Sequence, residues 1–143
     1  SIMNRNYDKS SRVIFDIQSL NNGILAGLVS ITAGCNNIEP WAALVVGFIG
    51  SLIFTAGSKL MLYFNLDDPI DAGPVHGFAG LWGVLAIGFF DKDKGILYGN
   101  SGQQLLTQFW CSIVIASWSA ITSAIVFLIL KLAFVSNSPG INL

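Results

Sequence analysis

The sequence predicts an all-α polytopic transmembrane protein, a helix bundle with about four membrane-spanning helices. Two observations predict this fold class. Hydrophobic residues make up 53% of the 143 residues and charged residues only 10%, far from the averages of soluble domains. In addition, three uncharged stretches reach the roughly 20 residues that a helix needs to cross about 30 Å of hydrocarbon. These stretches are residues 40–58, 72–90 and 95–130.

The first helix is expected to be short or discontinuous. Its apolar part, ILAGLVSITAGC, has only twelve residues, fewer than a full span needs. Residues 1–16, which precede it, form a flanking segment without the hydrophobic region and small-residue cleavage site of a signal peptide.

The last helix is expected to begin well inside the longest uncharged stretch, because the stretch opens with GILYGNSGQQ, which is rich in turn residues. The expected helices cover residues 17–36, 40–64, 68–90 and 104–132. Together they give a transmembrane domain over residues 17–134, followed by a C-terminal tail over 135–143.

The distribution of Lys and Arg predicts the orientation. With four spans, five basic residues fall on one side of the membrane and two on the other, and the side with more of them usually faces the cytoplasm. Both termini are therefore expected in the cytoplasm, and the segment 67–71 with them. The five are Arg5, Lys9, Arg12, Lys59 and Lys131, and the two are Lys92 and Lys94.

Several functional classes are not indicated. A net charge of −1 leaves no basic patch for nucleic acid. Cys35 and Cys111 lie in apolar runs with no second Cys or His nearby in sequence, so neither a metal site, a disulfide nor a cofactor site is predicted. An intramembrane hydrolase using His76 with Ser30 or Ser51 lacks a GxSxG-like nucleophile motif, so no enzyme is expected.

Small residues predict close helix packing. Projected at about 100° per residue, Gly73, Gly77, Gly80 and Gly88 fall in one stripe, and residues 73–77 form a GxxxG motif. Such faces let helix backbones approach closely in a membrane. We interpret the stripe as a packing surface rather than as the lining of a conduit.

The segment DDPIDAGPVHG, residues 67–77, places several polar groups at the start of a span. Asp68 is expected to be the N-cap, Pro69 the first helical residue, and Asp71 a carboxylate near the positive end of the helix dipole. The alternative, which we weigh below capping, is that Asp68 and Asp71 draw cations to a pore mouth, and the two roles are compatible. Pro74 is expected to bend or loosen the start of the helix.

His76 is the only histidine of the chain and lies about two turns into the expected span. Ionisable groups at such depth usually face the bundle interior or a water-filled cavity. One interpretation is a buried histidine bonded to a neighbouring helix. The other is a pore-lining group, because a neutral imidazole both donates and accepts hydrogen bonds and suits a small polar solute that does the same.

Four stretches resemble, in order and spacing, the last four transmembrane segments of the ammonium transporter (Amt/Mep) family. The DDP and VHG elements resemble this branch more than the related Rhesus branch. The stretches are NGILAGLVSITAGC (22–35), EPWAALVVGFIG (39–50), DDPIDAGPVHGFAGLWGVLAIGFF (67–90) and QQLLTQFWCSIVIASWSAITSAIVFLILKL (103–132).

The resemblance implies roles for four residues of the segment 67–77. His76 matches the second of two histidines that meet inside a hydrophobic pore, and Ala72 matches a pore-lining position. Asp68 and Asp71 match acids at the cytoplasmic start of that helix. Pro74 departs from the family pattern, which puts the local helix geometry in question.

The resemblance also implies a larger assembly. The family has eleven helices in each subunit of a trimer, so this chain is expected to be part of that fold, in a homotrimer with full-length subunits, in the plasma membrane and in contact with lipid. The expected substrate is ammonium or ammonia. Because this chain has no counterpart of the first seven helices, a truncated non-conducting protein or a regulatory partner of full-length subunits is the alternative.

Overall fold

The computed structural model describes residues 17–137, and these residues are helical apart from their connections. The elements in chain order are α1 (Ile17–Thr32), α2 (Pro40–Tyr63), η1 (Gly73–Phe78), α3 (Ala79–Phe90), η2 (Ile96–Tyr98) and α4 (Gln103–Asn137). Within the described residues the only β-type pairing is a single bridge between Ile38 and Asp91. The predicted all-α class is confirmed.

Within the described part of the chain, three helical segments are long and apolar enough to cross a membrane: Pro40–Tyr63, Gly73–Phe90 and Gln103–Ala133. The first helix is shorter than the 17–36 expected. It ends at Thr32, and the N–H groups of Asn37 and Ile38 then both bond to the carbonyl oxygen of Gly34 in a turn. With 16 residues, α1 is about 24 Å long, less than the hydrocarbon thickness.

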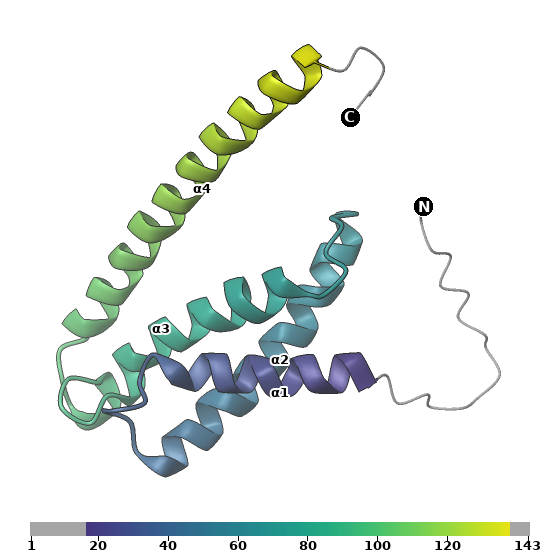
Figure 1. Ribbon diagram of the computed structural model, residues 1–143. Helices are drawn as coiled ribbons and strands as arrows, with labels where there is room; N and C mark the ends of the chain where they lie inside the picture. The colour runs from purple at the N-terminus through teal and green to yellow at the C-terminus, as the bar shows by residue number, and fades with distance from the viewer. Residues whose placement is uncertain (1–16, 138–143) are drawn as a thin grey trace.

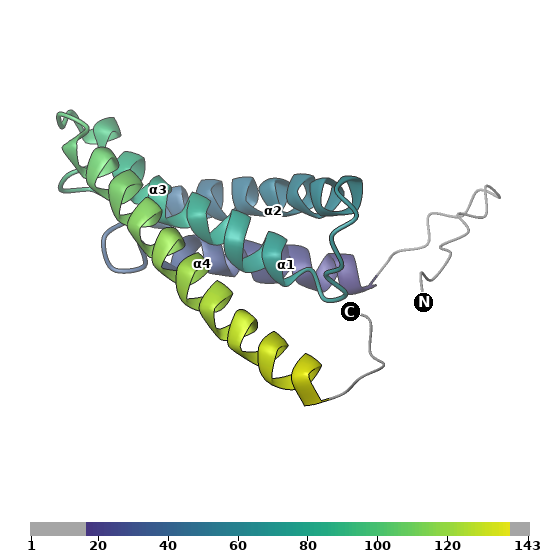
Figure 2. The same cartoon turned by 90° about the horizontal axis from the view of Figure 1, so that it is seen from above.

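The helices α1, α2 and α3 pack together, whereas α4 runs away from them at a wide angle (Figures 1 and 2). The main contact of α4 is with α3 near Gly88, where Leu105 lies against the glycine backbone. Large apolar side chains along α4 are exposed, among them Trp118 and Phe127. In lipid this exposure carries no hydrophobic penalty, because acyl chains are as apolar as the side chains.

The tightest crossing of the three packed helices is centred on Ser30 of α1. Its buried hydroxyl donates to the carbonyl oxygens of Ala26, at 2.8 Å, and of Ala79 in α3, at 3.0 Å. A Cβ on Gly83 would overlap the Ser30 carbonyl oxygen, and one on Gly50 of α2 would overlap the Ser30 hydroxyl. Absent side chains therefore allow three backbones to meet here. Around this point lie two clusters of buried apolar residues: Ala26, Phe54, Val75 and Ala79, and Ala42, Val46, Ala86 and Phe90.

The expected glycine stripe does not pack as one surface. A Cβ on Gly77 would meet no atom within 4 Å, and one on Gly80 would make only an ordinary contact with Val29 at 3.6 Å. Gly73 lies against the Asp68 carboxylate and Met61, whereas Gly88 packs on α4. The reason is the π-helix η1, whose wider turns break the projection at 100° per residue. The packing role expected for Gly77 thus finds no partner among the described residues.

Two boundaries also differ from expectation. The third helix begins at Ala72, directly before the π-helix η1, instead of at residue 68. Pro69 therefore lies in the preceding turn and is not the first helical residue. The helix α4 continues to Asn137, so the expected tail from 135 begins later. The flanking segment 1–16 and residues 138–143 lie outside the described residues.

Candidate functional site

The site is built on the turn that leads into η1, where Asp68 holds the first amides of the helix. Its Oδ1 accepts the N–H of Ala72 at 2.9 Å, and its Oδ2 accepts the N–H of Gly73 at 2.7 Å. Both N–H groups would otherwise lack a partner at a helix start, and a carboxylate there is also favoured by the helix dipole. Asp68 therefore caps the helix from outside its first turn.

Asp71 ties the same turn to the two neighbouring helices. Its Oδ1 accepts the hydroxyl of Ser58 in α2 at 2.8 Å, and its Oδ2 accepts the amide of Asn22 in α1 at 3.3 Å. Asn22 also donates to the carbonyl oxygen of Ile70 at 3.2 Å. The backbone of Asp71 has a φ of +56°, a left-handed conformation that Asp tolerates better than most residues.

The segment Gly73–Phe78 that follows is a π-helix. The N–H of Ala79 bonds to the carbonyl oxygen of Pro74, five residues earlier, instead of four as in an α-helix. Pro74 stands in the first turn, where its missing N–H removes no helical bond. A wide turn therefore occupies the place where the sequence suggested a loosened helix start.

The side chains of η1 divide between two faces. Pro74 and Val75 are buried, and Val75 packs with Ala26 of α1 and Phe54 of α2. His76 and Gly77 are exposed on the other face, and the His76 imidazole forms no hydrogen bond with another described residue. The interpretation of His76 as bonded to a neighbouring helix therefore has no counterpart within residues 17–137. Ala72, one turn earlier, is half-buried.

Asp91, at the opposite end of α3, is a buried acid that the sequence analysis did not single out. Burial alone would raise the pKa of its carboxyl, but hydrogen bonds from the N–H groups of Asp93 and Lys94 and from the Asn37 amide hold that pKa below its ordinary value. The N–H of Lys92 in turn bonds to the Asn37 carbonyl oxygen. Asp91 thus joins the α1–α2 connection to the end of α3.

A second interaction at that end involves Glu39, whose carboxylate accepts the indole N–H of Trp41 at 2.6 Å. Loss of hydration and the neighbouring Glu39 carboxylate raise the pKa of Tyr98. The Trp41 ring meets Phe90 edge to face. Trp41 is therefore part of a polar and aromatic junction at this end of α3.

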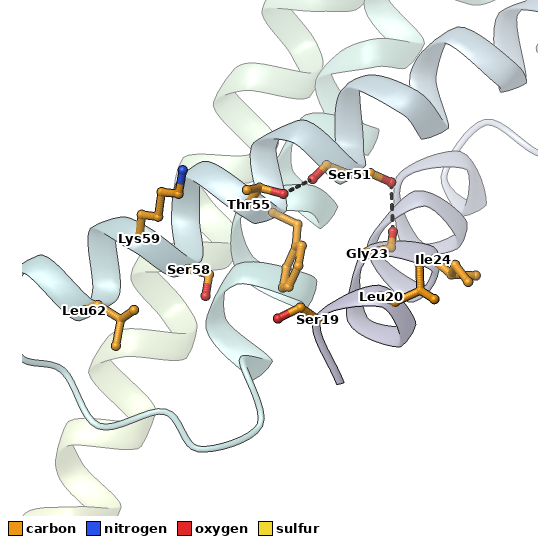
Figure 3. Close-up of a pocket in the computed structure, with 10 residues that line it drawn as sticks. Ser19, Leu20, Gly23, Ile24, Ser51, Thr55, Ser58, Lys59 and Leu62 are labelled. Atoms are coloured by element: carbon orange, nitrogen blue, oxygen red, sulfur yellow. Dashed lines mark hydrogen bonds between the residues drawn. The ribbon is translucent and has the colours of Figure 1, made fainter. Parts of the chain in front are cut away.

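A groove of about 500 Å³ lies between α1 and α2, away from His76. Figure 3 shows the hydroxyls of Ser51, Thr55 and Ser58 along it, with Lys59 at one side. The Ser51 hydroxyl donates to the Gly23 carbonyl oxygen at 2.8 Å. Because Ser30 and Ser51 both donate to backbone carbonyls, neither is paired with His76 as a hydrolase would require.

Among residues 17–137, no group of His, Cys, Asp and Glu is arranged to hold a metal ion. Cys35 and Cys111 are free thiols.

Comparison with known proteins shows a match between residues 4–136 and the Ammonium Transporter Family. The chain is 35% identical over 127 residues to ammonium transporter 1 member 3 of Solanum lycopersicum, covering 88% of this chain and 28% of that protein. It is 33% identical over 131 residues to ammonium transporter 1 member 1 of Arabidopsis thaliana, and the match covers 82% of this chain and 26% of that protein. It is 34% identical over 125 residues to ammonium transporter 3 of Dictyostelium discoideum, and the match covers 79% of this chain and 29% of that protein. The chain thus spans a little over a quarter of the length of these relatives.

Proposed function

The chain belongs to the ammonium transporter family, and on this premise we propose that its helices form part of a path that conducts ammonium or ammonia across a membrane. The similar proteins are themselves named as ammonium transporters, and this does not favour the alternative of a non-conducting or regulatory protein. Three apolar segments long enough to span a membrane support the proposal.

One observation carries the assignment of the pore wall: the sole imidazole of the chain lies on the exposed face of a π-helix inside an apolar span. π-Helical turns are rare and are found mostly at functional sites. On this proposal His76 lines the pore, and Ala72 contributes to the same wall one turn earlier. An imidazole in its neutral form both donates and accepts hydrogen bonds, as ammonia does.

Desolvation explains why such a pore would favour the neutral form. Moving a bare ammonium charge into a low-dielectric channel costs on the order of tens of kcal/mol in the idealised limit, whereas a neutral polar group costs only a few. Deprotonation at the entrance is therefore favoured. A narrow apolar path also excludes hydrated metal ions, because it cannot replace their ligand shells.

The remaining assignments concern the assembly. We propose that residues 17–134 form the transporter-like domain, that the protein is a homotrimer in the plasma membrane, and that both termini are cytoplasmic. The excess of Lys and Arg on one side supports this orientation. In this orientation Asp68 and Asp71 stand at the cytoplasmic mouth, and their bonds to Ala72, Asn22 and Ser58 support an ordering role for both.

Uptake of radiolabelled methylammonium tests the proposal. The chain is expressed alone and also as a chimera in which it replaces the matching segment of the Dictyostelium discoideum relative, in cells without ammonium transporters of their own. We expect His76→Ala to lower uptake by the chimera at least tenfold. Gln103→Ala, an exposed polar position at the start of α4, is the matched control and should leave uptake unchanged. Equal uptake by the parent chimera and its His76→Ala variant would remove His76 from the pore.

A further inference from the structure

We propose that Asp71 is a positioning residue whose carboxylate, held by Asn22 of α1 and Ser58 of α2, sets the rotation of the helical segment that carries His76. The inference rests on the proposed function, because it assigns a purpose to the placement of His76. It gives Asp71 a specific task that neither helix capping nor cation attraction describes.

The first argument is that Asp71 joins three elements through one side chain. Its two carboxylate oxygens accept from two different helices, at 2.8 Å from Ser58 and 3.3 Å from Asn22. Its backbone carbonyl meanwhile accepts the N–H of Val75 at 3.0 Å. Asp71 therefore connects the neighbouring helices directly to the residue that precedes His76.

The second argument is that the segment cannot fix its own rotation well. A π-helix has wider turns and is rarely stable beyond a single turn. The side chains of Pro74 and Val75 hold one face of η1 against α1 and α2, but the His76 face has no hydrogen bond to the other described residues. Phe78, at the other end of η1, lies against Gly57 of α2. The rotation of η1 therefore depends on this packing and on the anchors at its start, which are Asp68 and Asp71.

The third argument separates the two acids. Asp68 bonds to the N–H groups of Ala72 and Gly73 within its own turn, so it orders the turn locally. The Asp71 carboxylate instead accepts hydrogen bonds from neighbouring helices. Two more hydrogen bonds connect α1 to the same turn: the Asn22 amide donates to the Ile70 carbonyl oxygen, and the Gln18 amide donates to the Pro69 carbonyl oxygen at 3.1 Å. Only Asp71 has a carboxylate that reaches both α1 and α2.

The backbone of Asp71 supports the same conclusion. A φ of +56° is disfavoured for a residue with a Cβ, and glycine would adopt it without cost. Charge-assisted hydrogen bonds from the hydroxyl and the amide offset that cost. The turn geometry alone does not require an aspartate here, so the contribution of the Asp71 side chain is its hydrogen bonds to Ser58 and Asn22.

The single histidine makes a sharp experiment possible, since the chain labelled with histidine carrying ¹³C at Cε1 alone gives one imidazole resonance. The protein, purified with a histidine-free affinity tag and placed in lipid nanodiscs, is compared with Asn22→Asp, Asp71→Asn and the double variant. Asn22→Asp puts two carboxylates face to face, and the double variant restores an amide–carboxylate pair with the roles exchanged. Asp71→Gly permits the positive φ and removes the carboxylate.

The matched control is Asn37→Asp, because Asn37 donates to Asp91 at 3.2 Å in the same kind of pair at the opposite end of α3. We expect Asn22→Asp and Asp71→Gly to shift or split the His76 resonance. The double variant should reverse at least half of the shift seen in Asn22→Asp. Asn37→Asp should leave the resonance in place, although it lowers thermal stability by a similar amount.

An unmoved resonance in Asp71→Gly, no reversal in the double variant, or an equal shift in Asn37→Asp would overturn the inference. The His76 resonance can be measured without transport. A negative methylammonium assay with His76→Ala would refute the pore role of His76, whereas a negative result here would refute the positioning role of Asp71.

Discussion

The close approach of α1 and α3 leads to a prediction about Gly83. A Cβ at this position would overlap the carbonyl oxygen of Ser30 and lie 2.9 Å from its Cα and 3.0 Å from its carbonyl carbon. All three atoms belong to backbone, so no side chain can turn away and the helices must separate. Gly83→Ala is therefore expected to destabilise the fold.

The magnitude follows from two opposing terms. Overpacking typically costs about 1 to 3 kcal/mol, and three backbone contacts at once place Gly83→Ala near the upper value. Replacing glycine by alanine in a helix returns roughly 1 kcal/mol. The expected net loss in the free energy of unfolding is about 2 kcal/mol. Gly23→Ala in α1 is the matched control, because a Cβ there meets nothing within 4 Å, and it should gain up to about 1 kcal/mol.

The free energy of unfolding is measured by circular dichroism in detergent micelles titrated with sodium dodecyl sulfate. The two variants carry the same chemical change and should differ by about 3 kcal/mol, with opposite signs relative to the parent. If Gly83→Ala and Gly23→Ala unfold at the same detergent composition, the close packing of α1 on α3 is wrong.

Three further predictions concern buried polar groups. Ser30→Ala removes the hydroxyl that donates to the Ala79 carbonyl oxygen, and the same titration should show a loss of about 0.6 to 1.7 kcal/mol in the free energy of unfolding. An unchanged free energy of unfolding would contradict this prediction. Trp82→Phe removes the indole N–H that donates to the Val46 carbonyl oxygen at 3.0 Å, and a loss of about 0.5 to 1.5 kcal/mol is expected in thermal unfolding. The depressed pKa of Asp91 stabilises the fold at pH values above its ordinary pKa of 3.8, and this contribution is lost as the pH falls through the lower folded pKa. The parent should therefore lose stability below about pH 4 more steeply than Asp91→Asn, and parallel pH profiles would contradict the argument.

The spans could be predicted from the sequence because they depend on local properties. An uncharged run of sufficient length has few alternatives to a membrane helix, and the twelve-residue apolar stretch that ends at Cys35 already indicated a short first helix. The same composition predicted the all-α class.

The start of the third helix could not be predicted in detail. The projection at 100° per residue assumes a regular α-helix, whereas Gly73–Phe78 is a π-helix. Gly77 was therefore expected on a packing surface, but it has no packing partner within the described residues. Asp68 was expected to be the N-cap, yet it holds the N–H groups of Ala72 and Gly73 from four and five residues away.

Contacts between distant segments were the part that the sequence could not supply. Asn22 and Asp71 are 49 residues apart, and Asn37 and Asp91 are 54 apart. No local pattern specifies either pair, since each depends on how α1 lies against the ends of α3. The pore-lining roles of His76 and Ala72 stay predictions, supported by the family and by the exposed position of His76 on the π-helix.

The shape of α4 has a mechanical consequence. Its 35 residues extend about 50 Å, and the contact with α3 lies close to the beginning of that length, near Leu105. The helix therefore resembles a lever with its pivot at one end, and a tilt of about 5° at the pivot would swing the far end by roughly 4 Å. Neighbours other than α3 consequently decide where Asn137 comes to rest in the bilayer.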